Sequence, residues 1–90
     1  MSVDQNATIV SPRRLYRISQ TVNGGFDTYD SAVVVAESED DARRIHPCGI
    51  EAPWETWTWC APGHVTVELV GTADARFKAG DVVCASFNAG

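Results

Sequence analysis

Hydrophobic and polar residues alternate along much of this chain, and the alternation predicts β-strands. The pattern is clearest at Val65, Val67 and Leu69, which alternate with residues suited to the opposite face of a half-buried strand. A β-branched run from Ala32 to Ala36 is instead apolar on both faces, which favours a central strand of a sheet. Together the patterned stretches predict strands over residues 14–20, 29–36, 64–70 and 82–87.

A short helix is predicted directly after the second of these strands. Ser38 stands where an N-cap residue belongs, and the three acidic residues after it suit the positive end of a helix dipole. Pro47 limits the helix at its other end, because the residue before a proline avoids helical geometry. The sequence therefore predicts a helix of about two turns from Glu39 to Ile45.

These elements predict an α+β fold, in which an antiparallel sheet of four to five strands carries one short helix packed on one face. Asn23, Gly24 and Gly25 tolerate positive φ and predict the loop of a hairpin between the first two strands. The polar, patternless residues 1–12 are expected to form a flexible N-terminal leader. Residues 13–90 are long enough for one small domain with its own core.

Residues 46–63 differ in composition from the rest of the chain and contain all three tryptophans. A fifth short strand over 56–60 would place the indoles of Trp57 and Trp59 on one face. In one interpretation the tryptophans cover the sheet, which the shortage of other large core residues favours. In the other, Trp54, Trp57 and Trp59 form an exposed surface that contacts a partner, because tryptophan is favoured at binding hot spots.

The charge of the chain excludes one class of partner. Seven basic and twelve acidic residues give a formal net charge of −5, which repels a phosphate backbone and argues against direct nucleic-acid binding. Glu39, Asp40 and Asp41 belong to an acidic cluster that would suit a host protein that itself binds nucleic acid. A solvated face that complements the helix dipole explains the same cluster without a partner, and the modest net charge favours that explanation.

Two short segments contain the residues of a candidate zinc site. His46, Cys48, Cys60 and His64 are all competent ligands for tetrahedral zinc. Their spacing departs from the usual zinc-finger pattern, since neither half contains a Cys-x2-Cys knuckle. Unpaired thiols and solvent-facing histidines are the alternative, so no cofactor is expected. An odd number of cysteines without an export signal predicts reduced thiols in the cytoplasm, and no apolar run is long enough to cross a membrane.

Few features of the sequence indicate catalysis. Cys48 or Cys60 with His46 or His64 is the one combination suited to a nucleophile and its base. The sequence has no nucleophile elbow and no phosphate-binding glycine loop. The protein is therefore expected not to be an enzyme.

Five strings of the sequence are distinctive, namely LYRISQ (15–20), DTYDSAVV (27–34), AESEDDARRIHP (36–47), VTVELVG (65–71) and ASFNAG (85–90). They resemble a family of small bacteriophage and prophage proteins that has no established activity, and the resemblance is weakest between Cys48 and Gly63. It implies a phage or prophage origin, with an accessory or counter-defence role exerted by binding a host component.

The sequence and this resemblance together predict a non-enzymatic phage-type accessory protein of the bacterial cytoplasm. It would bind a host protein through the tryptophan segment or through the acidic helix start. Two alternatives stay open: a small-molecule or zinc-binding module centred on residues 46–64, and a structural or assembly protein of the phage particle. An exposed sheet edge in so small a domain also favours a homodimer, because pairing two edges satisfies their backbone groups.

Overall fold

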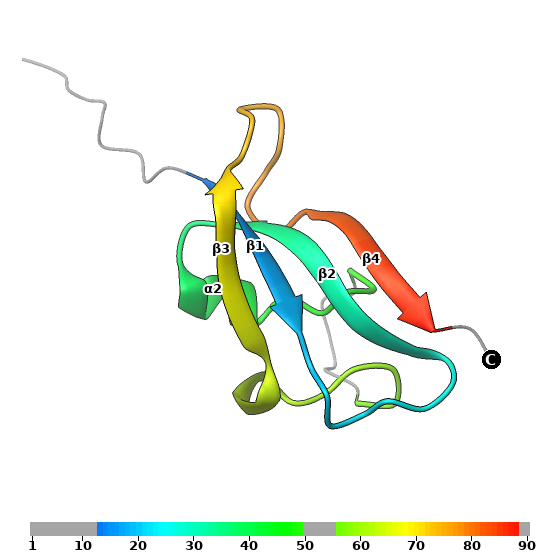
Figure 1. Ribbon diagram of the computed structural model, residues 1–90. Helices are drawn as coiled ribbons and strands as arrows, with labels where there is room; N and C mark the ends of the chain where they lie inside the picture. The colour runs from blue at the N-terminus through cyan, green and yellow to red at the C-terminus, as the bar shows by residue number, and fades with distance from the viewer. Residues whose placement is uncertain (1–12, 50–55, 89–90) are drawn as a thin grey trace, which may run out of the picture.

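A computed structural model describes residues 13–49 and 56–88 and shows a four-stranded antiparallel sheet with one short helix (Figure 1). The strands lie in the order β3-β1-β2-β4, and each neighbouring pair is antiparallel. The first two strands thus form the centre of the sheet, and β3 and β4 form its edges. In chain order the elements are β1 (Arg14–Ser19), β2 (Thr28–Ala36), α2 (Glu39–Arg43), the 3-10 turn η1 (Pro62–His64), β3 (Thr66–Thr72) and β4 (Val82–Asn88).

For residues 13–49 and 56–88 the structure confirms an antiparallel sheet with one short α-helix, and the mostly β content is compatible with a small α+β fold. Within the described residues the sheet has four strands, and the prediction of a strand over 56–60 is wrong, because that segment is irregular. The helix ends at Arg43 rather than Ile45. Its last turn tightens, since the N–H groups of Arg44 and Ile45 donate to carbonyls only three residues back.

The start of the helix has the predicted cap. Ser38 has extended backbone angles, and its hydroxyl accepts a hydrogen bond of 3.1 Å from the backbone N–H of Asp41. This bond satisfies one of the N–H groups that the first helical turn leaves without a partner in the helix. The cap lets a helix of only five residues begin directly after β2, where the chain turns back across the sheet.

The hairpin loop between β1 and β2 reverses the chain in a different way from the prediction. Asn23, Gly24 and Gly25 tolerate positive φ, but the left-handed residue of this loop is Asp27, with φ of 61°. Aspartate is among the few non-glycine residues that adopt this conformation readily. The N–H of Asp27 donates to the carbonyl of Asn88 at 2.6 Å, so the left-handed residue also joins the loop to the end of β4.

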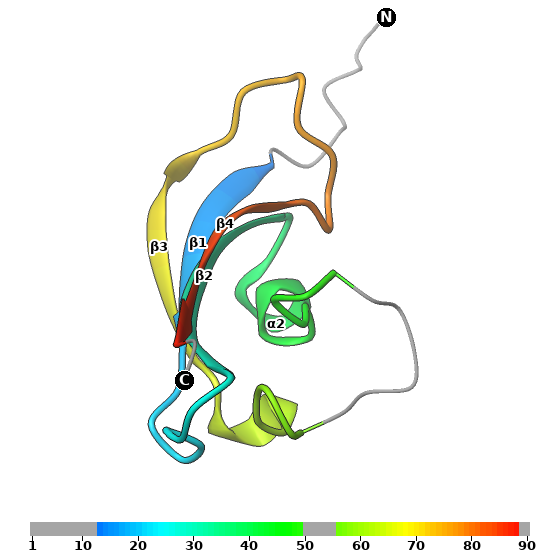
Figure 2. The same ribbon diagram turned by 90° about the vertical axis from the view of Figure 1, so that its right-hand side faces the viewer.

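The core lies between one face of the sheet and the segments that cover it. Figure 2 shows the sheet curving around α2, with residues 56–65 on the same concave side. The helix contributes Ala42, and the 56–65 segment contributes Trp59, Cys60 and Val65. The buried residues of the sheet in this cluster are Tyr16, Ile18, Ala32, Val34 and Ala36.

The connection between β3 and β4 crosses from one edge of the sheet to the other. Its end is bonded to β2, because Val35 accepts from the N–H of Gly80 and donates to the carbonyl of Asp81. Gly80 has φ of 99°, a conformation that disfavours any residue with a side chain. Val35 alternates with the core residue Val34 and lies outside the core cluster, yet it is fully buried beneath this part of the molecule.

Candidate protein-contact surface

Residues 56–60, which we call the clamped loop, are held by one side chain of the hairpin loop. The amide nitrogen of Asn23 lies 2.7, 3.0 and 2.8 Å from the carbonyl oxygens of Thr56, Trp57 and Trp59. All three partners are acceptors, so only the amide nitrogen suits this position, and its two hydrogens are shared among them. A single side chain thereby fixes the path of five residues that belong to no strand.

Asn23 is itself held in place by Gln20, which is buried at the end of β1. The Gln20 side-chain oxygen accepts from the N–H of Asn23 at 2.7 Å. Its nitrogen donates to the carbonyls of Asn23 at 2.7 Å and Tyr29 at 2.9 Å. The N–H of Tyr29 in turn donates to the carbonyl of Thr58 at 2.7 Å, which joins the clamped loop to β2.

Neither Gln20 nor Asn23 was predicted from the sequence to hold this loop, although the position of Gln20 in the pattern gives a signal. It continues the alternation of Tyr16 and Ile18 on the buried face, where a polar residue needs hydrogen-bond partners. Asn23 gave no comparable signal, because asparagine is equally common in an ordinary turn.

The two tryptophans of the clamped loop have opposite environments. Trp59 is fully buried in the core, whereas Trp57 is 82% exposed. The expectation that both indoles share one face is therefore wrong, because the loop lacks the regular pleat that would impose it. Trp59 covers the sheet as the first interpretation expects, Trp57 is exposed while its contact with a partner stays a prediction, and Trp54 lies outside the described residues.

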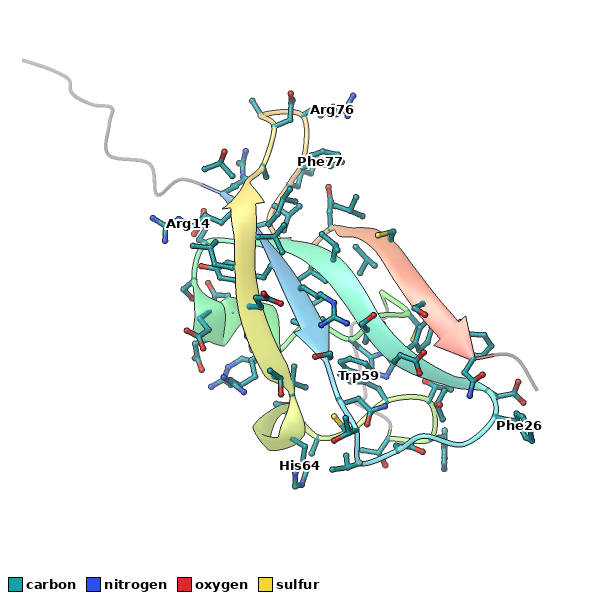
Figure 3. The ribbon with its side chains drawn as sticks, in the orientation of Figure 1. Arg14, Phe26, Trp59, His64, Arg76 and Phe77 are labelled. Carbon is teal, nitrogen blue, oxygen red and sulfur yellow. The ribbon has the colours of Figure 1, made fainter. Side chains whose placement is uncertain are left out.

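Trp57 is accompanied by two other exposed apolar residues on the hairpin loop, Val22 and Phe26. We call Val22, Phe26 and Trp57 the loop surface. Asn23 connects the two loops that carry it, and Figure 3 shows Phe26 projecting outward beyond the end of the sheet. Asp27 and Asp30, which follow Phe26, are also exposed. The loop surface therefore consists of exposed apolar side chains, and two exposed acidic residues follow Phe26 in the sequence.

The acidic helix start is paired within its own helix. Glu39 lies 3.5 Å from Arg43, and Asp40 lies 3.3 Å from Arg44, both at a spacing of four residues. The third acidic residue, Asp41, donates its backbone N–H to the cap. The guanidinium of Arg43 also donates to the carbonyl of Val65, and this hydrogen bond joins the helix to the 56–65 segment. These contacts fit the interpretation of the cluster as a solvated, dipole-complementing face.

The four candidate zinc ligands are not gathered into one site. His46 and Cys48 are close, with 3.1 Å between Nδ1 and Sγ, whereas Cys60 is buried in the core and His64 is exposed on η1. Burial raises the pKa of the Cys60 thiol, because the thiolate would lose its hydration there. Among the described residues no three or more His, Cys, Asp or Glu side chains are grouped to hold a metal ion.

The pair of His46 and Cys48 is the contact that most resembles a nucleophile with its base. Nδ1 of His46 also lies 3.2 Å from the backbone nitrogen of Cys48, which makes Nδ1 an acceptor. A hollow of about 160 Å³ exists elsewhere, lined by Arg17, Ser31, Ala32, Val33, Cys84, Ala85 and Ser86. The ring of His46 packs against Tyr29 on the core side of the sheet, so the pair and this hollow do not form one site.

Comparisons with protein-family models, with curated proteins and with solved structures found no match to this chain. In the described part of the chain, no helix is long and apolar enough to cross a membrane.

Proposed function

We propose that this protein is a non-enzymatic binding module of phage type that captures a bacterial host protein through the loop surface. The observation that carries the proposal is the exposure of Trp57 on a loop whose backbone is fixed at three carbonyls. A large aromatic side chain on a rigid loop can be buried by a partner with little loss of conformational entropy. The same side chain adds nothing to the core of the isolated protein.

The partner we propose has an apolar pocket surrounded by basic residues. Val22, Phe26 and Trp57 offer the apolar part, the exposed Asp27 follows Phe26 in the sequence, and the carboxylate of the exposed Asp30 accepts from the hydroxyl of Ser86 at 3.4 Å. The net charge of −5 favours approach to a positively charged surface and disfavours approach to a phosphate backbone. A host protein fits these features better than a nucleic acid.

The experiment uses the full chain immobilised on resin and exposed to a lysate of the bacterial host, followed by calorimetry with the purified partner. Trp57→Ala is expected to weaken binding at least about tenfold, or about 1.4 kcal/mol. Leu69→Ala is the matched control, because Leu69 is an exposed apolar residue on β3, away from both loops. Unchanged affinity of a folded Trp57→Ala variant would contradict the proposal.

The same assay compares the second candidate surface. Reversing the charges of Asp40 and Asp41 to lysine is expected to affect binding less than Trp57→Ala, because Asp40 already pairs with Arg44. A larger effect of the charge reversals than of Trp57→Ala would indicate that the partner contacts the helix start and not the loops. A folded protein that assembles into large closed particles, with no host partner, would instead support the role in phage assembly.

The alternative of a zinc-binding module is supported only by the contact of His46 with Cys48. Native mass spectrometry of protein purified without chelator measures it directly. A mass excess of one zinc ion that disappears in Cys48→Ser would favour the alternative, whereas its retention in that variant would exclude this thiol as a ligand.

A further inference from the structure

The turn that follows α2 holds an exposed thiol against a buried imidazole. His46, Pro47, Cys48 and Gly49 form this turn, in which the carbonyl of His46 accepts from the N–H of Gly49 at 2.9 Å. Proline suits the second position of such a turn, and Gly49 has φ of 78°, a conformation that glycine adopts readily. The backbone thus fixes the positions from which His46 and Cys48 extend their side chains.

The imidazole is held in place by burial and by a ring contact. His46 is 2% exposed, and its ring meets the ring of Tyr29 edge-on, with 6.4 Å between centroids. Its Nδ1 lies 3.1 Å from Sγ of Cys48 and 3.2 Å from the backbone nitrogen of the same residue. Because Nδ1 accepts from the backbone N–H, it is the ring nitrogen without a proton, and it also accepts from the thiol.

We propose that Cys48 is a site of reversible thiol–disulfide exchange, in which His46 accepts the thiol proton and a small disulfide is the reactant. The proton moves from Sγ to Nδ1, and the thiolate attacks one sulfur of the disulfide R–S–S–R. A bond forms between Sγ and that sulfur, and the S–S bond of the reactant breaks. The leaving half takes the proton from the imidazolium and departs as R–SH, so Cys48 is oxidised to a mixed disulfide while that half is reduced.

The other two cysteines show what distinguishes Cys48. Cys60 is buried, and burial raises the pKa of its thiol because the thiolate would lose its hydration. Cys84 is exposed, and the hollow beside it contains Arg17, whose guanidinium attracts a thiolate but cannot accept its proton. Within residues 13–49 and 56–88, Cys48 is the cysteine that combines an exposed thiol with an imidazole nitrogen in hydrogen-bond reach.

Thiol exchange needs fewer groups than the other reactions suited to this pair. A structural zinc site takes four ligands, and among the described residues no third His, Cys, Asp or Glu is grouped with His46 and Cys48. A hydrolase would need a pocket for its substrate, whereas exchange with a small disulfide needs an accessible thiol and a base. The pair supplies both. This inference is independent of the loop surface and of any host partner.

The first test treats the full-length protein, in buffer with a chelator, with hydroxyethyl disulfide, a small uncharged disulfide, and locates the adducts over time by peptide mass spectrometry. Cys48 is expected to react at least about tenfold faster than Cys84, the matched exposed thiol, and dithiothreitol should release the adduct. Cys60 reports on unfolding, since it should stay unmodified while the protein is folded. Equal rates at Cys48 and Cys84 would overturn the proposal.

Two further measurements separate the effect of the imidazole from that of accessibility. His46→Asn keeps an acceptor for the backbone N–H of Cys48 but cannot take up a proton, so it should lower the rate at Cys48 at least about tenfold and leave the rate at Cys84 unchanged. An unmodified Cys60 shows that this variant is folded. In urea the wild type should lose its preference for Cys48, because the turn is lost, and this measurement needs no variant. A preference that persists in folded His46→Asn, or in urea, would contradict the role of His46.

Discussion

Trp57 and Trp59 are separated by one residue, yet one lies almost entirely in solvent and the other is fully buried. Both belong to the clamped loop, and the bonds of Asn23 reach the carbonyls of both residues. Their backbone is therefore held equally, while their side chains have opposite roles. Equal support of the backbone therefore does not determine which indole enters the core in this irregular loop, whereas in a strand the pleat determines it.

Trp59 stabilises the fold, whereas Trp57 is available to a binding partner. Burying a large aromatic side chain stabilises a fold by several kcal/mol, so Trp59 fills a place in the core that few other residues here could fill. Trp57, which is 82% exposed, gains far less from burial in the isolated chain. A tryptophan exposed to this degree is the residue we expect a partner to cover.

The largest predicted effect is at the buried tryptophan. Trp59→Ala is expected to lower the free energy of unfolding by about 3–5 kcal/mol, because it removes a large side chain and leaves a cavity. Trp57→Ala is expected to change it by less than about 0.5 kcal/mol, as for most exposed positions. Urea unfolding followed by far-ultraviolet circular dichroism measures both.

Because Trp59→Ala removes much of the stability of a small domain, Trp59→Phe provides a milder variant that keeps an aromatic ring in the core. It should fall between the wild type and the alanine variant. If Trp57→Ala and Trp59→Ala lowered the free energy of unfolding by similar amounts, the indole of Trp57 would also pack against the fold. The two tryptophans would then not have different roles.

The next effect is predicted for the clamp. Asn23→Ala removes the donor that serves three carbonyls, and we expect a loss of about 1–2 kcal/mol. Asn23→Asp should be more damaging despite its similar shape, because its carboxylate oxygens would face carbonyl oxygens. Urea unfolding gives the ranking, and hydrogen exchange should show faster exchange in residues 56–60. Equal stability of the two variants would mean that the amide donor is not what holds the loop.

The regular elements were predictable from the sequence because local patterns determine them. Alternation and apolar runs located the four strands of the described residues to within a few positions, and Ser38 with the acidic residues after it located the helix start. Each of these signals lies within the element that it predicts. The order of the strands was not predictable, because local patterns do not show which strands pair. β3 and β4 are consecutive in the chain, yet they lie at opposite edges of the sheet.

The clamped loop was not predictable in the same way, because its conformation depends on residues more than thirty positions away. The amide of Asn23 reaches Trp59 across 36 positions, and no pattern within 56–60 reveals that contact. The alternation of Trp57 and Trp59 resembles a strand, but a strand also needs a neighbour to pair with. The position of the left-handed residue, Asp27 instead of a glycine, likewise follows from its bond to the end of β4.

The buried side of the clamped loop also has a predicted pH dependence. Burial raises the pKa of the Cys60 thiol, so the thiol ionises at lower pH in the unfolded chain than in the folded one. Its contribution to stability is therefore complete at neutral pH and is lost as the pH rises through the unfolded and then the folded pKa. Unfolding measured at neutral and alkaline pH should show a steeper loss for the wild type than for Cys60→Ala.

Cys84→Ala is the control for that measurement, because its thiol is exposed and its removal should leave the pH slope unchanged. A thiol reagent at neutral pH gives an independent check. Cys48 and Cys84 should react in the folded protein, and Cys60 only after unfolding. Rapid reaction of Cys60 in the native state would show that the buried side of the loop opens readily.

The smallest effect is predicted at the acidic helix start, which is exposed like Trp57. Asp40→Asn removes an ion pair between two solvent-exposed side chains, and such pairs contribute about 0.3–0.5 kcal/mol. Unfolding in low and moderate salt should therefore differ little between the variant and the wild type. A loss above about 1 kcal/mol would show that the carboxylate supports the fold beyond this pair. The exposed residues would then no longer be equivalent, since Asp40 would hold the structure while Trp57 remained available to a partner.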